Sequence, residues 1–315
     1  MEFIQEIQRF VDEKDDIDSS SALISYYLPL WSDMVEKEGE IVSFNFSHQA
    51  VSQPELDIFI DSIILHNIPM ESVNFSNLNL SDEDMGLVCR LLSPLNSYSP
   101  SYFCSLNLSG NNFTYKAMEH LKEVLMHCPK FMSLDLSWNG IGRYGGLCMG
   151  ELIASHPTLR SLTLDHCSLD ETGIISILSV ILETPHCPLK ALSINSPSLV
   201  TPSDNSSLYS HLAQVVASSS PLSHLSVDGW NLRSDGCSFL AQALSPDHFI
   251  SSLSISNNQI SIEGSHILVS AIMRFQIPIK HLTLKVSFMF LHFYQSPFLF
   301  RGTKWQMKEL DHSPN

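Results

Sequence analysis

Nine copies of one short apolar frame follow each other along this chain. The frame reads apolar-x-x-apolar-x-apolar-x-x-(Asn or Cys)-x-apolar, and successive copies lie 28 to 33 residues apart. All four apolar positions hold apolar residues in every copy, although only 44% of the chain is apolar. An array of structural repeats explains this pattern, because each repeat buries the same face against its neighbours. The third apolar position falls at Phe46, Phe75, Leu108, Leu136, Leu164, Ile194, Val227, Ile255 and Leu284.

Each period has room for a strand, a loop and a helix of about 12 residues. Apolar stripes with helical spacing lie between the frames, over residues 117–125 and 208–216. A third stripe comprises Ile267, Leu268, Ala271 and Ile272. A capping box is expected at residues 81–84, and helix N-caps are expected at Thr114, Asp170, Ser234 and Ser261.

The asparagine or cysteine position of the frame is less regular than the apolar positions. A side chain at this place normally hydrogen-bonds the backbone of the turn. Four frames fit, with Asn111, Asn139, Cys167 and Asn258. The other five turns need another way to satisfy their backbone groups, because they carry Gln49, Leu78, Pro197, Trp230 and Ser287.

The chain resembles the ribonuclease-inhibitor-like class of leucine-rich-repeat proteins. The resemblance is carried best by Leu106-Asn-Leu108-Ser-Gly-Asn111 and Leu134-Asp-Leu136-Ser-Trp-Asn139, and it covers residues 41–289. It implies an α/β solenoid, or horseshoe, of about nine repeats, with a parallel β-sheet on the concave face and helices on the convex face. The class includes nuclease inhibitors, innate-immune sensor domains, actin-filament cappers, ubiquitin-ligase adaptors and activators of a small GTPase.

Two end segments flank the predicted solenoid. Residues 1–40 contain two apolar clusters and are interpreted as a helical N-terminal cap, with a separate short recognition helix as the alternative. In residues 290–315 the frame fades, and no polar capping repeat follows. The sequence favours a truncated or alternatively ended form over an irregular cap on the last repeat.

Composition favours a cytoplasmic protein, with the nucleus as a further possibility. The chain opens without a signal-peptide pattern, and its longest apolar stretch is too short to span a bilayer. Seven cysteines are scattered without a CxxC pair, which is typical of buried thiols in a reducing compartment. Several Asn-x-Ser/Thr sequons compete with this interpretation, but the frame itself supplies Asn and Ser at these places.

Nearly all of the net charge of −16 lies in the N-terminal quarter. Residues 1–84 carry 18 acidic and 3 basic residues, whereas the remainder is almost neutral. This acidic end either attracts a basic partner or simply keeps a solvated cap monomeric and soluble, and the second interpretation is favoured. Without a basic stripe to neutralise phosphates, nucleic acid is not an expected partner.

The face of the sheet opposite the core can be read from the residues between the apolar positions. It is formed mainly by Ser, Asn and Thr, whereas a tight interface needs aromatic or arginine anchors. Trp138 and His166, flanked by Asp135 and Asp165, are therefore expected to form a partner-binding patch on neighbouring repeats.

Two alternatives to this patch stay open. Asp228 and Trp230 form a second, weaker candidate cluster, although Trp230 is expected rather to fill the turn where asparagine is missing. Alternatively, the serine and asparagine residues of this face have no role in binding, and the partner contacts the loops or the N-terminal cap instead.

The sequence contains no motif typical of catalysis, of a cofactor or of a metal site. Asp165-His166-Cys167 suggests a Cys–His pair, but Cys167 occupies the buried turn position of the frame. By resemblance, a small-GTPase activator would need a well-placed asparagine and a catalytic arginine near the first repeats, and residues 41–89 contain no arginine. We therefore expect a non-catalytic adaptor that binds a protein, as a monomer or in a hetero-complex, with no membrane or nucleic-acid partner. A regulator that inhibits or activates an enzyme is the alternative.

Overall fold

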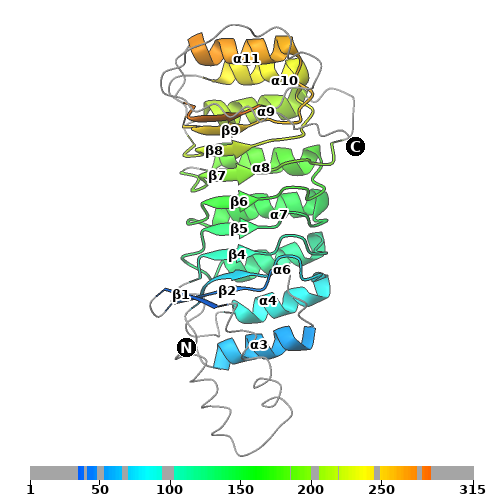
Figure 1. Ribbon diagram of the computed structural model, residues 1–315, viewed down its shortest axis with the longest axis vertical. Helices are drawn as coiled ribbons and strands as arrows, with labels where there is room; N and C mark the ends of the chain where they lie inside the picture. The colour runs from blue at the N-terminus through cyan, green and yellow to red at the C-terminus, as the bar shows by residue number, and fades with distance from the viewer. Residues whose placement is uncertain are drawn as a thin grey trace, which may run out of the picture. The chain divides into compact units, whose positions relative to one another are not determined.

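The computed structural model describes residues 35–38, 41–47, 53–65, 70–93, 103–184, 186–199, 206–218, 220–244, 249–274 and 279–284. The chain divides into two compact units, Met1–Asn139 and Gly140–Asn315. Within each unit, strands and helices alternate along the chain, and the helices cover one face of the strands (Figure 1). The nine strands that follow the frame and their helices confirm an α/β leucine-rich-repeat solenoid of about nine repeats.

The first unit contains the first four of these repeat strands. Strands β2 to β5 pair in parallel and in chain order, and β1 pairs antiparallel with β2. Its elements are β1 (Val35–Glu38), β2 (Ile41–Asn45), α3 (Gln53–Leu65), β3 (Met70–Asn74), the 3-10 helix η1 (Asp82–Asp84), α4 (Met85–Leu91), β4 (Ser105–Asn107), α6 (Tyr115–Leu125) and β5 (Ser133–Asp135).

The second unit contains five parallel strands in chain order, each of three residues. Its elements are α7 (Gly142–Ser155), β6 (Ser161–Thr163), α8 (Glu171–Glu183), β7 (Ala191–Ser193), α9 (Ser206–Ala217), β8 (His224–Ser226), α10 (Arg233–Ala243), β9 (Ser252–Ser254), α11 (Ile262–Arg274) and β10 (His281–Thr283).

The apolar frame forms the core of both units. Among the frame positions whose side chains the structure describes, all are buried except Leu199 and Leu284, which are half-buried. Burial of these side chains is the main favourable term in the stability of the array, because each repeat covers the apolar face of the next.

Part of the predicted helical N-terminal cap is a strand. Val35–Glu38 forms β1, whose register with β2 pairs Val35 with Phe44 and Glu38 with Ile41. Only two residues separate β1 from β2, and such a short connection favours antiparallel pairing. The two apolar clusters on which the helical interpretation depended lie outside the described residues, as do residues 290–315.

The helix starts agree with the sequence at three of the four expected N-caps. Thr114 and Asp170 cap α6 and α8 by accepting hydrogen bonds from the backbone N–H groups of Lys116 and Gly173, at 3.3 and 2.9 Å. Ser261 Oγ accepts from the N–H of Gly264 at 3.2 Å.

The prediction that Ser234 is a helix N-cap is wrong. Helix α10 begins one residue earlier, at Arg233, and Leu232 is its N-cap. The Oγ of Ser234 instead lies 2.7 Å from the Oγ of Ser261 in the next repeat. A hydroxyl that bonds between repeats is therefore indistinguishable in sequence from one that caps a helix.

The third apolar stripe is also narrower than expected. In α11, Leu268 and Ile272 are buried, but Ile267 is 39% exposed and Ala271 is half-buried. The buried residues therefore follow a single row with a spacing of four, to which Gly264 also belongs.

Glycine allows the close approach of α7 and α8. A Cβ atom at Gly146 would lie 2.8 Å from the Cα of Gly173 and 3.0 Å from its carbonyl oxygen, and backbone atoms cannot rotate away. At Gly150 the nearest atom would be the Oγ of Ser176, at 3.2 Å. Position 146 therefore requires glycine for packing.

Replacing Gly146 with alanine is expected to lower the free energy of unfolding by about 2 kcal/mol, because the added methyl group forces two helices apart. Gly86 in α4 is the matched control, since a Cβ there meets nothing within 4 Å. Gly86→Ala should raise stability by about 0.5–1 kcal/mol through helix propensity. Urea denaturation followed by circular dichroism measures both. Equal midpoint shifts in the two variants would contradict the packing argument.

Candidate functional site

Polar side chains at the ends of the strands in the first unit fold back onto their own repeat. The Oδ1 atoms of Asn74 and Asn107 accept hydrogen bonds from the backbone N–H groups two residues later, at 3.0 and 2.9 Å. Asp135 Oδ1 accepts from both the N–H and the Oγ of Ser137, at 2.9 and 2.6 Å. These Asx turns complete the strand ends locally.

In the second unit, the strand ends are joined between repeats instead. Asp165 Oδ1 accepts from the Oγ of Ser193 at 2.7 Å and from the N–H of Asn195 at 2.9 Å. Asn195 Oδ1 accepts in turn from Ser226 Oγ and from the N–H of Asp228, at 2.9 and 2.8 Å.

These hydrogen bonds run from repeat to repeat, and we call them the polar ladder. Its last step starts from Asp228. Its Oδ1 accepts from the Oγ of Ser254 and the N–H of Ser256, each at 2.7 Å. The last residue of these strands is Ser or Thr, whose hydroxyl forms a local turn more weakly than the Asn and Asp side chains of the first unit, and this favours the polar ladder. Asp165 and Asp228 therefore have a structural role on this face.

A second set of side chains is buried and hydrogen-bonds the backbone groups of the turns. Asn111 Oδ1 accepts from the N–H groups of Leu78 and Leu80, and its Nδ2 donates to the carbonyl of Phe75 at 2.9 Å. The Nδ2 atoms of Asn139 and Asn258 donate likewise to the carbonyls of Leu108 and Val227, at 2.9 and 2.8 Å. In each case the acceptor is the third frame position of the preceding repeat.

Trp230 performs the same function with an indole. Its side chain is 0% exposed, and Nε1 donates to the carbonyl of Ile194 at 2.5 Å. Ile194 is the third frame position of the preceding repeat, so Trp230 replaces the missing asparagine as donor and fills the turn with its ring. A buried indole offers no surface to a partner, and Trp230 is therefore not carried into the proposed binding surface.

One backbone position of each turn lies in the left-handed region. The residue before the asparagine or cysteine position has φ between 50° and 75° at Asn77, Gly110, Trp138, His166, Ser196, Gly229 and Asn257. Glycine and asparagine adopt this conformation at low cost, whereas a bulky residue there costs about 1–2 kcal/mol. Trp138, with φ 59°, is thus held in a conformation that its side chain disfavours.

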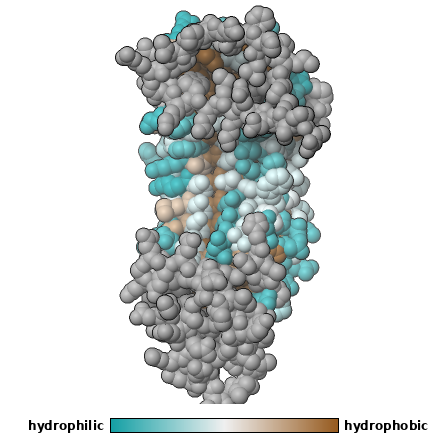
Figure 2. Space-filling view, viewed as in Figure 1, coloured by the Kyte–Doolittle hydropathy of each residue, from teal (hydrophilic) through white to brown (hydrophobic). Residues whose placement is uncertain are grey.

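Trp138 is also the most exposed of the large apolar residues that the structure describes, at 62%. It follows Ser137 in the turn after β5, and the N–H of Gly110 in the neighbouring repeat donates to the Ser137 carbonyl at 2.7 Å. Figure 2 shows that the described surface in view is mostly polar or neutral, with hydrophobic residues mainly in a narrow strip. Tryptophan is one of the residue types enriched among the anchors of protein interfaces.

The predicted patch residues belong to both units. Asp135 and Trp138 lie in the first unit, where the carboxylate is half-buried and the indole exposed. Asp165 and His166 lie in the second unit, and both are half-buried. His166 has φ 54° and thus occupies the same left-handed turn position as Trp138. Each pair lies at or just after the end of its strand.

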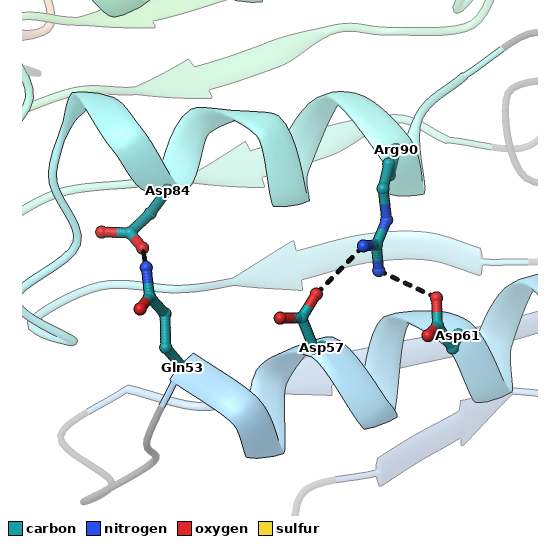
Figure 3. Close-up of polar contacts among 5 residues, drawn as sticks. All are labelled: Gln53, Asp57, Asp61, Asp84 and Arg90. Atoms are coloured by element: carbon teal, nitrogen blue, oxygen red, sulfur yellow. Dashed lines mark hydrogen bonds and ion pairs between the residues drawn. The ribbon is translucent and has the colours of Figure 1, made fainter.

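Acidic residues of the first unit are partly committed to internal contacts. Figure 3 shows Arg90 of α4 between Asp57 and Asp61 of α3, with Nη1 and Nη2 at 3.0 and 2.8 Å from the two carboxylates. Asp82 accepts from the N–H of Thr114 at 2.7 Å and from its Oγ1 at 2.5 Å.

Asp84 has a similar structural role. Its Oδ2 accepts from the N–H of Ser81 at 2.7 Å, and its Oδ1 accepts from Gln53 Nε2. The acidic run at 81–84 therefore stabilises a helix start and the contact between α3 and α4.

The cysteines are packed rather than reactive. All seven are free thiols, and five of them, including Cys167, are buried. Burial raises the pKa of the Cys128 thiol to about 12 and that of Cys237 to about 11. Cys167 is only 1% exposed, so a substrate does not reach its sulfur. In the part of the chain that the structure describes, no group of three His, Cys, Asp or Glu side chains could hold a metal ion.

Comparison with known proteins gives the class of the fold. Residues 127–150 match the family model described as "Leucine Rich repeat". The crystal structure of the leucine-rich-repeat-containing protein LegL7 from Legionella pneumophila aligns with a TM-score of 0.50 and 17% identity, over 77% of this chain and 73% of that one. The fold is therefore that of a leucine-rich-repeat protein, and proteins of this class generally mediate protein–protein interaction.

Two curated relatives share the repeats. The human protein "NACHT, LRR and PYD domains-containing protein 5" is 24% identical over 212 residues, or 65% of this chain and 16% of that protein. The "Tonsoku-like protein" of Danio rerio is 28% identical over 187 residues, or 57% of this chain and 13% of that protein. The chain thus spans well under a quarter of the length of the curated relatives it matches.

Among the described helices, none combines the length and the apolar character needed to cross a bilayer.

Proposed function

We propose that this chain is a non-catalytic adaptor of the ribonuclease-inhibitor-like type that binds a protein partner through the strand-end face of its repeats. The observation that carries the proposal is Trp138, a 62% exposed indole at a φ of 59°. A residue that is costly for the fold and exposed to solvent is best explained by a partner that buries it.

The surface around this anchor has the composition of a protein-binding site. Asp135 lies three residues before Trp138 in the first unit. In the next repeat along the sequence, which belongs to the second unit, His166 occupies the position of Trp138 and Asp165 occupies that of Ser137. The second oxygen of Asp135 is outside the Asx turn, which uses Oδ1 only. Aromatic anchors surrounded by polar groups with spare hydrogen-bonding capacity are typical of interfaces.

The subtype rests on repeat length. Periods of 28 to 33 residues and helices of 11 to 14 residues on most repeats support the ribonuclease-inhibitor-like type. Seven free cysteines support a reducing compartment, the cytoplasm or nucleus. The name of the human relative includes NACHT and PYD domains beside the leucine-rich repeats, which supports a role for repeats like these as the recognition part of a larger protein.

Trp138→Gly separates binding from folding. The substitution should raise the free energy of unfolding by about 1 kcal/mol, because glycine relieves the left-handed strain. Loss of an anchor should lower affinity at least about 30-fold. Quantitative affinity capture from cells, comparing wild type with the variant, identifies the proteins lost, and titration of the purified partner then measures the change.

Tyr144→Ala is the control, since Tyr144 is exposed to a similar degree, 60%, but lies on α7. If Trp138→Gly and Asp165→Ala retain every partner that the wild type captures, the proposed surface is wrong. Recovery of a single enzyme whose activity changes on binding would favour the enzyme regulator over the adaptor.

A further inference from the structure

Basic residues gather at the N-terminal ends of the strands in the second unit. Lys190 directly precedes β7 and Lys280 directly precedes β10, and both are exposed. Backbone hydrogen bonds place them on one row: Ser223 N–H donates to the Lys190 carbonyl, Ser251 to Ser223, and Lys280 to Ser251, at 2.8 to 2.9 Å. With strands about 4.8 Å apart, the two lysines lie about 14 Å from each other.

Two histidines extend this row onto the sheet. His224 and His281 open β8 and β10 and are exposed, whereas the residues after them, Leu225 and Leu282, are buried. Both histidines pair with Ser252 of β9, so they occupy one column two strands apart, or about 10 Å. Each imidazole offers at least one N–H donor in either charge state.

Arg160 continues the row by one more strand. It precedes β6, and the N–H groups of Lys190 and Ala191 both donate to its carbonyl, at 2.8 and 2.9 Å. Its Nη1 donates to the carbonyl of Pro188 at 2.9 Å, which holds the guanidinium beside the row. We call the set of Arg160, Lys190, His224, Lys280 and His281 the basic row.

Three of the carboxylates that the structure describes in this unit lie away from the basic row. Asp165 and Asp228 follow their strands and are held in the polar ladder at the opposite end of the sheet. Asp170 accepts from Arg143 at the start of α8, at 2.6 Å. Within the described ranges, none of the two lysines and two histidines of the basic row takes part in an ion pair.

The basic row is not a property of the repeat itself. The same backbone position in the first unit is occupied by Glu71, Cys104 and Met132, which are linked by the equivalent hydrogen bonds. In the second unit, Ser223 and Ser251 occupy this position between the two lysines. The backbone therefore accepts neutral, acidic and basic residues here, and the fold does not require the positive charge of the basic row.

We propose that the basic row is a docking site for a short, extended, acidic peptide segment of a partner protein. In an extended chain, side chains four residues apart lie about 13–14 Å from each other on one face, which matches the distance between Lys190 and Lys280. A local cluster of cations attracts a short acidic segment, whereas the net charge of −16 repels a long polyanion such as nucleic acid. This inference rests on the proposed protein-binding function but uses a different surface from Trp138.

The test is fluorescence anisotropy with a labelled peptide of alternating Glu and Ser, at low and moderate salt. Lys190→Glu and Lys280→Glu should each weaken binding about 3- to 10-fold, and the double variant more than about 10-fold. Lys116→Glu is the matched control, because it makes the same charge change on an exposed lysine of α6. It should change the affinity less than about 2-fold. Circular dichroism verifies that each variant folds.

Several results would overturn the proposal. The first is an equal loss of peptide affinity in Lys116→Glu and Lys190→Glu. The second is binding of a Gln–Ser peptide as tight as that of the Glu–Ser peptide. The third is tighter binding of a single-stranded oligonucleotide than of the acidic peptide. Trp138→Gly should leave peptide binding unchanged. If the peptide fails to bind while Trp138→Gly still loses its cellular partner, the basic row is refuted and the proposed function stands.

Discussion

Replacing Asn111 with alanine is expected to lower the free energy of unfolding by about 3–5 kcal/mol. The side chain is 5% exposed and bonds two backbone N–H groups, of Leu78 and Leu80, and two carbonyls, of Phe75 and Leu108, at 2.8 to 3.1 Å. Alanine leaves these buried groups without a partner, and each orphaned group costs about 1–3 kcal/mol. The turn relaxes partly and water enters, so the total loss of stability stays below the sum of the highest costs for the four groups.

Asn112 provides the control in the adjacent residue. Its side chain is exposed and donates to the Oδ1 of Asn79 at 2.6 Å. Asn112→Ala should therefore change stability by no more than about 0.5 kcal/mol. Urea denaturation, followed by tryptophan fluorescence and circular dichroism, gives both values. A loss below about 1 kcal/mol for Asn111→Ala would show that the asparagine is not the main support of this turn.

Replacing Trp230 with alanine should cost a comparable amount, about 3–5 kcal/mol, for a different physical reason. The loss combines a cavity the size of an indole with the orphaned carbonyl of Ile194. Trp230→Phe keeps most of the volume and loses the N–H donor, and it should cost about 1–3 kcal/mol. The difference between the two variants separates packing from hydrogen bonding.

Trp138→Ala is the matched variant at an exposed tryptophan. At 62% exposure the indole contributes little to the core, so the free energy of unfolding should change by less than about 0.5 kcal/mol. Thermal and urea unfolding of the three variants measure the contrast. Equal losses at positions 138 and 230 would contradict the assignment of one tryptophan to the surface and the other to the core.

The fold was predictable because burial imposes a strict rule on many positions at once. An apolar residue such as Leu134 or Ile255 can occupy its frame position only if the chain repeats the same turn, and the structure buries both. The helix starts at Thr114 and Asp170 were predictable for a similar reason, since an orphaned N–H needs an acceptor nearby in sequence.

The errors arise where a contact is made with another repeat. Ser234 bonds Ser261 rather than its own helix, and β1 is set by pairing with β2, so neither is encoded locally. The candidate surface was partly readable, because a tryptophan among serines is conspicuous. The commitment of Asp165 and Asp228 to the polar ladder was not, since it depends on which neighbour their oxygens meet. The basic row was missed because its members come from repeats that are distant in sequence and are brought together only by the parallel register.

The polar ladder of the second unit also links neighbouring repeats energetically at the surface. Asn195 donates to Asp165 and accepts from Ser226 and Asp228, so a ligand that takes over its amide breaks hydrogen bonds in two other repeats. At about 1 kcal/mol for each net hydrogen bond, occupation of one strand end changes the affinity of the next by several-fold. In the first unit, the Asx turns bond within their own repeat, so they add no such side-chain link between adjacent strand ends. We therefore expect contacts with a partner to be more strongly coupled on the second unit than on the first.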